Sequence, residues 1–568
     1  MPNRTDIWRD LRDLPDVPVL ILGGGVNGCG LLRELALQGV DALLVDKADF
    51  VAGASSTSSR MIHGGLRYLE HREFALVRES LLERNRLLEN AAHYVSPLRT
   101  TIPLYSWLGG LLRSSLIFLG IPVRPGGRGA LITKLGLTFY DFVTRKHRLL
   151  PKHRFRSREE TLAEVPGLDP AIVAAATYYD AQISQAERLC IELLADARAA
   201  HPGCRAVNYV RPVRVDDGAV VLCDEVTGEM ARLRPRVVVN ATGAWVDAAN
   251  ACLGVETRYM GGTKGSHLVV ANPRLHAMLG DRMVYYQHTD GRVCIVFPFE
   301  DKVLMGSTDL RVNDPEAARC EEGEIAYMLT TLRTVFPGIT IRRDQIVYVF
   351  CGVRPLPATG EGVTANISRG HSLRVLEPGR NRPFPVLCLI GGKWTTFRAL
   401  AAEAADATLA RLGASRRCST VAAPIGGGRG FPQDEDEKRA WIDRVTAASG
   451  LAPDRVTVLL ARYGTRAEAY ATSAEARTET PLSTLPDYTD AEVRRIAAGE
   501  QVVHLDDLVC RRSTIALTGR TTPEALLELA RLVGPVLGWD ETQQAEEVRR
   551  TLAEVAVPEA DAPGGPGG

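Results

Sequence analysis

Apolar runs and one helical periodicity mark the first ordered unit of the chain. Residues Val17–Leu22 are almost all apolar and predict a buried strand, and apolar residues spaced for one helix face run from about Asn27 to Gln38. Gly39 ends that helix, and Ala42–Val45 is a second apolar run of strand length. The pattern predicts a β-α-β unit of about 30 residues, with parallel strands and a right-handed crossover.

Further along the chain, helical and strand periods alternate. Residues Arg72–His93 carry apolar residues on one helix face, and Val207–Val221 and Arg234–Asn240 are typical of strands. Residues Met283–Met305 alternate enough to predict antiparallel hairpins. Val386–Ile390 is a short apolar strand, followed by two glycines and a helix that ends near residue 412. Strands joined by helices in this way indicate a mixed α/β fold.

Changes of composition divide the chain into four parts. The first sixteen residues are polar and are expected to form a loose arm. A stretch from Pro424 to Pro432 is interpreted as a linker, because no acid-tipped strand follows its glycine cluster Gly426–Gly430. Helical patterns dominate beyond it, and the last residues are rich in Pro, Gly and Ala. The predicted parts are the arm 1–16, the α/β part 17–413, the helical part 414–557 and a disordered tail 558–568.

The overall composition is that of an ordinary globular protein. The 568 residues are 45% hydrophobic and 24% charged, and 68 Lys+Arg balance 68 Asp+Glu. These values exclude a disordered, collagen-like or coiled-coil chain, and a net charge of zero gives no reason to expect nucleic acid as a partner. The 11 cysteines form no Cys-x-x-Cys motif, so they predict a reducing compartment and no metal site. No apolar run predicts a transmembrane helix, and the N-terminus lacks the apolar core of a signal peptide.

The strongest local motif lies between the first predicted strand and the first helix. Gly23, Gly25 and Gly28 form a G-x-G-x-x-G pattern, which suits a tight turn, close approach of a pyrophosphate and close packing of helix on strand. The N-terminus of the helix adds free N–H groups and the positive end of its dipole. Asp46 ends the second strand, where a carboxylate can accept hydrogen bonds from ribose hydroxyls and would repel a 2′-phosphate. The motif predicts a site for NAD or FAD rather than NADP.

The Ser- and Gly-rich run that follows makes a family resemblance specific. It reads ASSTSSRMIHGGLRYLE from Ala54 to Glu70. Later blocks follow in the family's order at Lys264–His267, Gly306–Asp309, Gly352–Leu356 and Gly391–Thr396. Together they resemble the FAD-dependent, respiratory and quinone-linked glycerol-3-phosphate dehydrogenases. The resemblance is good over residues 17–412 and weaker beyond them.

The resemblance implies FAD as the cofactor and a particular architecture. It implies a Rossmann-like FAD-binding domain of the glutathione-reductase/D-amino-acid-oxidase type, an interleaved antiparallel substrate domain and an α-helical C-terminal domain. On the residues alone, Gly64-Gly65 would let a flat ring approach the backbone, and a helix beginning near Thr395 would direct its positive end at the flavin. The residues expected to face FAD are Gly23, Gly25, Val26, Asn27, Gly28, Asp46, Lys47, Ser55, Ser56, Ser58, Ser59, His63, Gly65, Val210, Ala241, Thr242, Gly243, Gly392, Lys393 and Thr395.

The implied substrate is sn-glycerol 3-phosphate, oxidised at C2 to dihydroxyacetone phosphate by hydride transfer to flavin N5. Its phosphate calls for cations, and Arg67 and Arg354 are the candidates, with Lys393 near the ring. Tyr68 can hydrogen-bond the same phosphate. Either arginine alone would more often be a surface charge or part of a structural ion pair, and their position inside the motifs carries the assignment.

The reaction also needs a base for the hydroxyl proton, and neutral histidine is the usual one. His267 and His63 both lie inside the motifs. We expect His267 to be the base and His63 to be a hydrogen-bond partner of flavin or substrate, with the assignment between them left open.

A basic and apolar segment covers residues 96–155. It holds ten Lys and Arg but only one acid, Asp141, and between these charges lie Trp107, Leu135, Phe139 and many leucines. This combination suits a membrane interface, whereas the interrupting Gly and Pro residues prevent a membrane span. A buried helical pair is the alternative, and the segment is too aliphatic for nucleic acid. The resemblance implies a peripheral protein on the cytoplasmic face of the inner (plasma) membrane, which passes electrons to a membrane quinone and is a possible homodimer.

Two other functions fit parts of the same pattern. An α-glycerophosphate oxidase would give the electrons to oxygen, but such relatives usually carry an extra insertion that has no clear counterpart here. A non-catalytic, membrane-associated FAD-binding protein would need no substrate residues. The coexistence of Arg67, His267, Arg354 and Lys393 argues against the second alternative.

Overall fold

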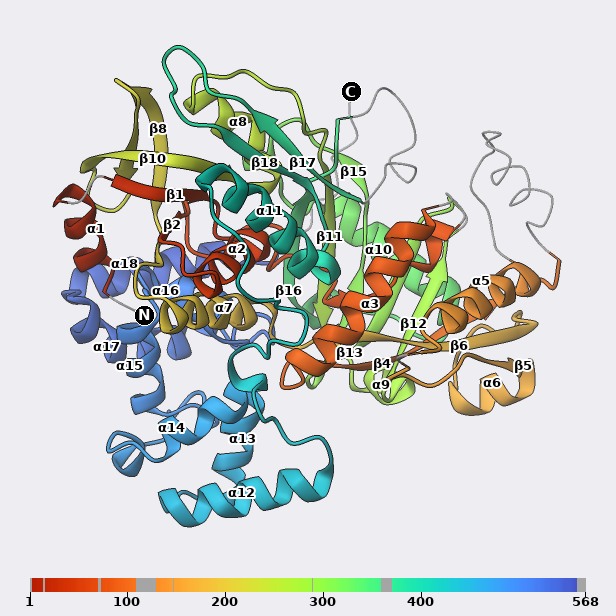
Figure 1. Cartoon of the computed structure of the whole chain (residues 1–568). Coiled ribbons are helices and arrows are strands. Elements are labelled where there is room, and N and C mark those ends of the chain that lie inside the picture. Colours follow the sequence, from red (N-terminus) through yellow and green to blue (C-terminus); the bar gives the residue numbers. More distant parts are fainter. Residues whose placement is uncertain are drawn as a thin grey trace, which may run out of the picture.

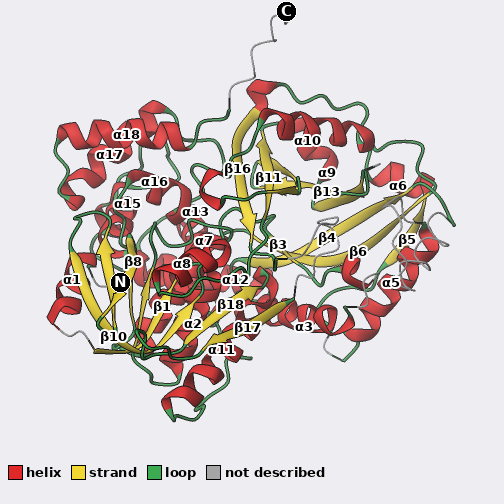
Figure 2. Cartoon of the chain, turned by 90° about the horizontal axis from the view of Figure 1, so that it is seen from above, coloured by secondary structure: helices red, strands yellow, loops and turns green. Residues whose placement is uncertain are grey.

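The computed structural model describes residues 3–13, 16–69, 73–108, 129–146, 148–288, 290–358 and 370–558, with only the backbone of Asp13 and Arg67 (Figure 1). Two sheets lie side by side in this part of the chain, and a helical C-terminal region covers one end of the first sheet (Figure 2). The predicted tail from residue 559 onward lies outside the described residues.

The first sheet has eight strands within the described chain, and its centre is parallel. β1 (Asp16–Leu22) pairs in parallel with β2 (Ala42–Val45) on one side and with β10 (Met230–Asn240) on the other. α2 (Val26–Leu37) connects β1 to β2, which confirms the predicted β-α-β unit. Because Leu22 lies opposite both Val45 and Asn240, the carboxyl ends of the three strands meet at one edge. The other strands are β7 (Arg205–Val207), β8 (Val210–Asp216), β9 (Ala219–Asp224), β17 (His371–Leu376) and β18 (Val386–Gly391).

Helices cover both faces of this sheet. On one face α2 packs against α7 (Ala186–Ala200) and α11 (Phe397–Leu412), and their apolar residues join those of the strands in one core. On the other face α8 (Val246–Cys252) and the β8–β9 hairpin close a second core. Burial of the central strands on both faces explains why their sequences are continuously apolar.

The N-terminal residues form a helix, so the expected loose arm is wrong. α1 (Arg4–Asp13) buries Ile7, Trp8 and Leu11 against the second core of the first sheet. Three apolar residues on one face of a ten-residue helix are too few to predict it from the sequence, but packing on the sheet stabilises it. Arg4 fixes the helix further through a salt bridge to Asp224.

The second sheet has ten strands within the described residues and is mostly antiparallel. β12 (Arg282–Gln287), β13 (Val293–Phe299) and β14 (Lys302–Gly306) are successive antiparallel neighbours, which confirms the predicted hairpins. β11 (Thr263–Val270) pairs with β14 and, along its whole length, with β16 (Ile346–Arg354). The other strands are β3 (Met61–Ile62), β4 (Val95–Leu104), β5 (Arg154–Ser157), β6 (Ala174–Ile183) and β15 (Leu310–Arg311). The helices around this sheet are α3 (Phe74–Asn90), α5 (Ala130–Val143), α6 (Arg158–Glu164), α9 (Pro273–Leu279) and α10 (Glu322–Val335).

The C-terminal region is helical, as predicted, and it has two small cores of its own. The predicted linker before it is packed rather than free: Ile425 N–H donates to Asn90 O, and Gly427 N–H donates to the Glu192 carboxylate. The helices are α12 (Glu435–Ser449), α13 (Pro453–Tyr463), α14 (Ala467–Ala471), α15 (Asp490–Gly499), α16 (Leu505–Asp507), α17 (Pro523–Leu537) and α18 (Glu541–Glu554), with a π-helical turn at Leu508–Arg512.

Among the described residues, no helix combines the length and the apolar character that crossing a bilayer requires. The same residues contain no cluster of His, Cys, Asp and Glu suited to a metal ion.

Candidate functional site

The glycine motif lies at the carboxyl edge of the first sheet, between β1 and α2. Gly23 has φ +102°, and a Cβ there would lie 2.7 Å from Ala241 O. A Cβ at Gly28 would lie 1.9 Å from Gly23 O, so only glycine lets the helix approach the turn this closely. Gly25 caps the helix without a side chain, and Val26 N–H at its first turn donates to Ser55 Oγ over 3.0 Å. The predicted turn geometry is therefore present, with the Ser-rich loop beside it.

Asp46 directly follows β2 and lies beside this turn. Its carboxylate accepts a hydrogen bond from Gly24 N–H at 2.6 Å and another from Ala48 N–H at 2.9 Å. Burial raises the pKa of Asp46 to about 6. Val210 N–H donates to Asp46 O over 2.6 Å, which brings the start of β8 against the same corner. Asp46 and Val210 are thus neighbours, as an adenosine site at this corner requires.

Two further predicted cofactor segments reach the same edge. Thr242 follows β10, and its hydroxyl donates to Asn240 Oδ1, while Gly243 adopts φ +61°. Asn27 faces the turn after β18, because a Cβ at Gly392 would lie 3.3 Å from its Nδ2. The Asn27 side-chain oxygen is buried and has no hydrogen-bond partner among the described residues.

Residues from the second sheet form a first polar cluster. His267 is only 2% exposed, stacks on Phe350 with ring centroids 4.9 Å apart, and shares a 2.8 Å hydrogen bond between Nε2 and Ser59 Oγ. Burial, and then the charges of Arg354 and Arg60, lower the pKa of His267 to about 3. The imidazole is therefore neutral at physiological pH.

Arg354 ends β16 and lies across β11 in the same cluster. A Cβ at Gly265 would meet its guanidinium at 2.0 Å, so the glycine creates the space for it. The guanidinium donates to Ser307 Oγ at 3.1 Å, to Thr308 O at 3.0 Å and to Asp309 Oδ1 at 3.2 Å. Gly265 and His267 share one face of β11, because they are two residues apart on a strand. The arginine and the histidine therefore lie on the same side of the sheet.

A second cluster surrounds the turn after β18. Lys393 donates to Ser80 Oγ at 2.6 Å, and its ammonium lies 4.7 Å from the centre of the Tyr68 ring. The Thr395 hydroxyl accepts from His63 N–H over 3.1 Å and lies 3.3 Å from His63 O. Lys393, Tyr68, His63 and Thr395 are therefore brought together from two distant motifs. The Ser-rich loop contacts both clusters, because Ser59 is hydrogen-bonded to His267, and Trp394, next to Lys393 in the chain, donates to Ser55 O at 2.8 Å.

The glycine pair beside His63 has a different explanation from the one expected. A Cβ at Gly64 would lie 2.4 Å from Leu81 Cδ2 and 2.6 Å from the Tyr140 hydroxyl, and a Cβ at Gly65 would lie 2.2 Å from the Tyr68 ring. Gly65 also has φ +78°. Protein side chains, rather than an open space for a flat ring, fill the positions where these glycines lack a side chain.

Some predicted residues have other partners. Lys47 forms a salt bridge with Glu316 and lies 4.4 Å from the centre of the Trp245 ring, so it reaches toward the second sheet. Ser56 Oγ donates to Gly53 O, and Ser58 Oγ accepts from Arg60 N–H. The backbone of Arg67 lies in a 3-10 turn, but its side chain lies outside the described part.

Sequence reasoning missed several groups that hold the predicted ones. Ser80 on α3 holds Lys393, Phe350 on β16 supports His267, and Asp309 pairs with Arg354. Asp180 on β6 accepts from Gly64 N–H at 3.2 Å and from Arg84 at 2.9 Å. Asp309 had a signal, since it lies in a motif block, whereas Ser80 and Asp180 lie in a helix and a strand without one.

These observations fit an FAD dinucleotide at the carboxyl edge of the first sheet. The glycine turn keeps side chains away from the N-terminus of α2, Asp46 lies beside this turn where a ribose would be expected, and the Asn27 side-chain oxygen is buried without a partner among the described residues.

Comparisons with known proteins point the same way. A family model described as FAD dependent oxidoreductase matches residues 18–407, and a model described as the C-terminal domain of alpha-glycerophosphate oxidase matches residues 418–544. A glycerol-3-phosphate dehydrogenase from Synechocystis is 31% identical over 572 residues, which cover 95% of this chain and 97% of that protein. A D-erythritol 1-phosphate dehydrogenase from Brucella abortus is 32% identical over 388 residues, which cover 67% of this chain and 72% of that protein.

The likeness to a solved structure extends over the whole fold. The glycerol-3-phosphate dehydrogenase from Bacillus halodurans, solved in complex with FAD, aligns with a TM-score of 0.73 and 98% coverage of both chains. Its sequence identity is 21%, so this match concerns the fold, including the helical C-terminal region.

Proposed function

The chain belongs to the FAD-dependent glycerol-3-phosphate dehydrogenase family, and from this premise we propose that it oxidises sn-glycerol 3-phosphate to dihydroxyacetone phosphate and passes the electrons to a membrane quinone. FAD, when bound, supplies the acceptor for the hydrogen that leaves C2 with its electron pair. The observation that carries the proposal is the pair of cationic clusters, one containing Arg354 and the other Lys393, that the Ser-rich loop contacts through Ser59 and Ser55.

Arg354 and Lys393 bind the substrate phosphate in this proposal. The guanidinium of Arg354 is already oriented by Ser307, Thr308 and Asp309, so little side-chain freedom is lost when an anion binds. Lys393 is held by Ser80, and Tyr68 adds a phenol beside it. Arg67 remains a candidate from the sequence alone.

His267 accepts the hydroxyl proton, through Ser59 rather than directly. The ring is almost fully covered, whereas Ser59 is only partly buried and is hydrogen-bonded to Nε2. A proton can therefore pass from the C2 hydroxyl to Ser59 Oγ while the Ser59 proton moves to Nε2. A pKa of about 3 makes His267 a weak base in the free protein, and the negative charge of a bound phosphate raises that pKa toward the useful range. His63, which is half-buried beside Thr395, is the alternative base.

The surface around α5 supports a membrane-bound electron acceptor. Leu135 is 65% exposed and Phe142 is 56% exposed on this helix. Trp107 and Leu108, which end the preceding described segment, are exposed as well. Exposed basic residues accompany them at Lys134, Arg145, Lys146 and Arg148. Apolar side chains among cations favour an anionic membrane surface, where a quinone is available. Residues 109–128 of the predicted segment lie outside the described part.

Anaerobic flavin bleaching tests the proposal. The purified holoenzyme is mixed with sn-glycerol 3-phosphate without oxygen, and loss of the oxidised-flavin absorbance is the expected result. Re-oxidation by a soluble quinone analogue much faster than by air-saturated buffer supports a dehydrogenase, and the reverse order supports an oxidase. No bleaching by glycerol 3-phosphate, with bleaching by a four-carbon polyol phosphate, would move the substrate toward that of the Brucella relative. No bleaching by either would leave a non-catalytic FAD-binding protein.

A further inference from the structure

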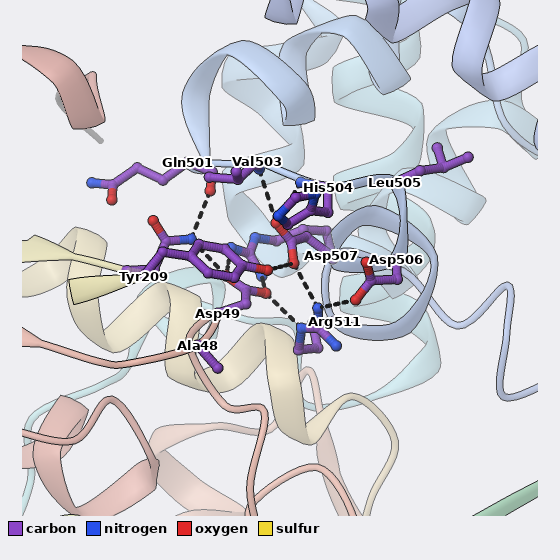
Figure 3. A network of polar contacts seen from close by, with 12 residues as sticks. Ala48, Asp49, Tyr209, Gln501, Val503, His504, Leu505, Asp506, Asp507 and Arg511 are labelled. Atoms are coloured by element: carbon purple, nitrogen blue, oxygen red, sulfur yellow. Dashed lines mark hydrogen bonds and ion pairs between the residues drawn. The ribbon is translucent and has the colours of Figure 1, made fainter. Parts of the chain in front are cut away.

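A buried network joins the C-terminal helices to the corner of the first sheet where Asp49 and Tyr209 lie (Figure 3). Three segments meet there: the loop after β2, the turn between β7 and β8, and residues 500–512 before α17. Asp46 lies three residues before Asp49 of the first segment, and Val210 directly follows Tyr209 of the second. The C-terminal helices therefore contact the two segments that carry Asp46 and Val210, the residues of the proposed adenosine site.

Asp49 receives two arginines from the C-terminal region. Arg512 donates to both oxygens of Asp49 at 2.8 Å, and Arg511 donates to Asp49 Oδ2 at 2.6 Å. The Asp49 and Arg512 side chains are 0% exposed. Burial alone would raise the pKa of Asp49, but the charges of Arg512 and Arg511 lower it to about 2. Asp49 is thus a carboxylate whose only described cationic partners come from the C-terminal region, and removing one leaves a buried charge poorly compensated.

The turn between β7 and β8 is held from the same side. Asn208 Nδ2 donates to Asp49 Oδ1 at 2.8 Å and to Gln501 O at 2.9 Å. The Tyr209 hydroxyl donates to Asp507 Oδ1 at 2.7 Å, and Asp507 also accepts from Arg511 at 2.6 Å. The loop after β2 and the turn between β7 and β8 are thus hydrogen-bonded to each other and to the C-terminal region.

Tyr209 and Gln501 both adopt the left-handed backbone conformation, with φ +55° and +54°. This conformation is strained for residues with a side chain and persists where the surroundings impose it. In this strained turn, Tyr209 N–H donates a hydrogen bond to Ala48 O at 2.9 Å, next to the hydrogen bond from Val210 N–H to Asp46 O. The side-chain network therefore maintains the backbone positions at which Asp46 and Val210 stand.

We propose that the C-terminal region is a clamp for the adenosine half of FAD, with Arg512 and Asp507 as positioning residues that act through Asp49 and Tyr209. The ligand of the clamped corner is an adenine nucleotide, either free or as part of FAD. This inference rests on the proposed assignment of Asp46 and Val210 to the adenosine end, whereas FAD as the cofactor does not depend on it.

The test measures binding rather than turnover, in the full-length chain. FAD is removed reversibly, and dissociation constants are measured for FAD and, by competition, for ADP. The main variant is Arg512→Met, and Arg512→Lys tests rescue by a remaining positive charge. The matched control is Arg455→Met, because Arg455 is a largely covered C-terminal arginine, with its side chain 14% exposed, that binds two carboxylates, Glu479 and Glu492, outside the network around Asp49.

Arg512→Met should weaken FAD and ADP by the same factor, about 10-fold or more, with partial recovery in Arg512→Lys. Arg455→Met should lower the unfolding temperature while leaving both dissociation constants within about twofold. The visible spectrum of FAD bound to Arg512→Met should match that of the unmodified chain, because the flavin end is unaffected. Equal loss of FAD affinity in Arg455→Met would overturn the clamp and leave a general stability effect.

Two further readouts keep the proposal testable. If Arg512→Met does not fold, Tyr209→Phe removes a single hydrogen bond from the same network, and it should weaken ADP about threefold to tenfold. Unchanged ADP affinity in Tyr209→Phe would then contradict the clamp. If ADP does not compete with FAD in the unmodified chain, the assignment of this corner to adenosine fails, and the clamp fails with it, although FAD binding itself would stand.

Discussion

Ser59 and His267 share a hydrogen bond of 2.8 Å between Oγ and Nε2, and Ser59 is the more exposed of the two. The pair has the geometry of an activated hydroxyl, because the more exposed Ser59 hydroxyl is hydrogen-bonded to a neutral imidazole. The stacking of His267 on Phe350 fixes the ring plane. In the proposed function, these two residues, which come from different motifs, together take the proton from the substrate hydroxyl.

The first prediction concerns this pair. His267→Gln removes the proton acceptor but keeps a side chain of similar size, and it should lower kcat about 100-fold or more while FAD remains bound. Ser59→Ala should lower kcat by a similar factor, because it breaks the path to Nε2. Rapid anaerobic bleaching measures the chemical step in both variants.

His63→Gln is the comparison that decides between the two histidines. His63 is hydrogen-bonded to Thr395 through its backbone, and its ring lies beside the Tyr68 ring, with centroids 6.3 Å apart, in the Lys393 cluster. A loss of bleaching rate in His63→Gln that exceeds the loss in His267→Gln would transfer the base to His63. A near-normal rate in His267→Gln would remove His267 from the proposed mechanism.

The second prediction uses one methyl group to move Arg354. In Gly265→Ala the new Cβ would meet the guanidinium at 2.0 Å, and a flexible side chain can swing away from it. The substrate phosphate would then lose an oriented cation, so KM should rise about 10-fold or more with a smaller change in kcat. Steady-state kinetics measure the split, and FAD content should stay unchanged because Gly265 lies on the second sheet, whereas the glycine turn belongs to the first sheet. An unchanged KM would argue against Arg354 as a phosphate ligand.

The third prediction follows from the raised pKa of Asp46. Burial raises this pKa to about 6 in the FAD-free chain, and the ribose hydroxyls require the carboxylate as an acceptor. FAD affinity should therefore be full above about pH 6 and should fall as the pH decreases through that value, by at most about 10-fold per pH unit. Titrations of the apoprotein from pH 5 to pH 8 measure this dependence. Asp46→Asn should bind FAD more weakly at pH 8 and show a flatter profile, and an equally steep profile in that variant would contradict the assignment.

The sequence could predict the elements whose signal is local. The unit of β1, α2 and β2 is predictable from the sequence, because its apolar periods and its glycines lie within one stretch of chain. α1 is not predictable from the sequence, since the helix is stabilised only when Ile7, Trp8 and Leu11 pack against the first sheet. The packed segment at Gly427 looked like a linker for the same reason, because its partner Glu192 lies far away in the sequence.

The residues of the candidate site also fall into two groups, those that the sequence predicts and those that only the fold brings into place. His267, Arg354 and Lys393 were predicted because each lies in a recognisable block, and the structure brings each to a polar cluster. The partners that orient them were mostly missed. A lone Ser80 in a helix or Asp180 in a strand has no spacing signal, and only the fold brings them to the turn after β18 and to Gly64.

The fourth prediction concerns the exposed face of α5. This helix lies at the end of the molecule opposite α17 and α18 in both overall views (Figures 1 and 2). Leu135 and Phe142 are more than half exposed there, so changing them to glutamate removes little buried apolar contact. The double variant Leu135→Glu/Phe142→Glu should lose binding to vesicles that contain anionic lipid, because it removes inserted apolar area and adds repulsive charge.

Met230→Glu/Leu527→Glu is the matched control, because these residues are also exposed and apolar but lie on β10 and α17. Vesicle sedimentation at low and high salt measures binding, and the unmodified chain should bind less at high salt since the basic residues around α5 contribute through screened attraction. Each cation removed there, as in Lys134→Gln, should weaken binding about fivefold at low salt. If the unmodified chain ignored anionic vesicles at low salt, or if the control lost as much binding as the α5 variant, the surface around α5 would not be the membrane contact.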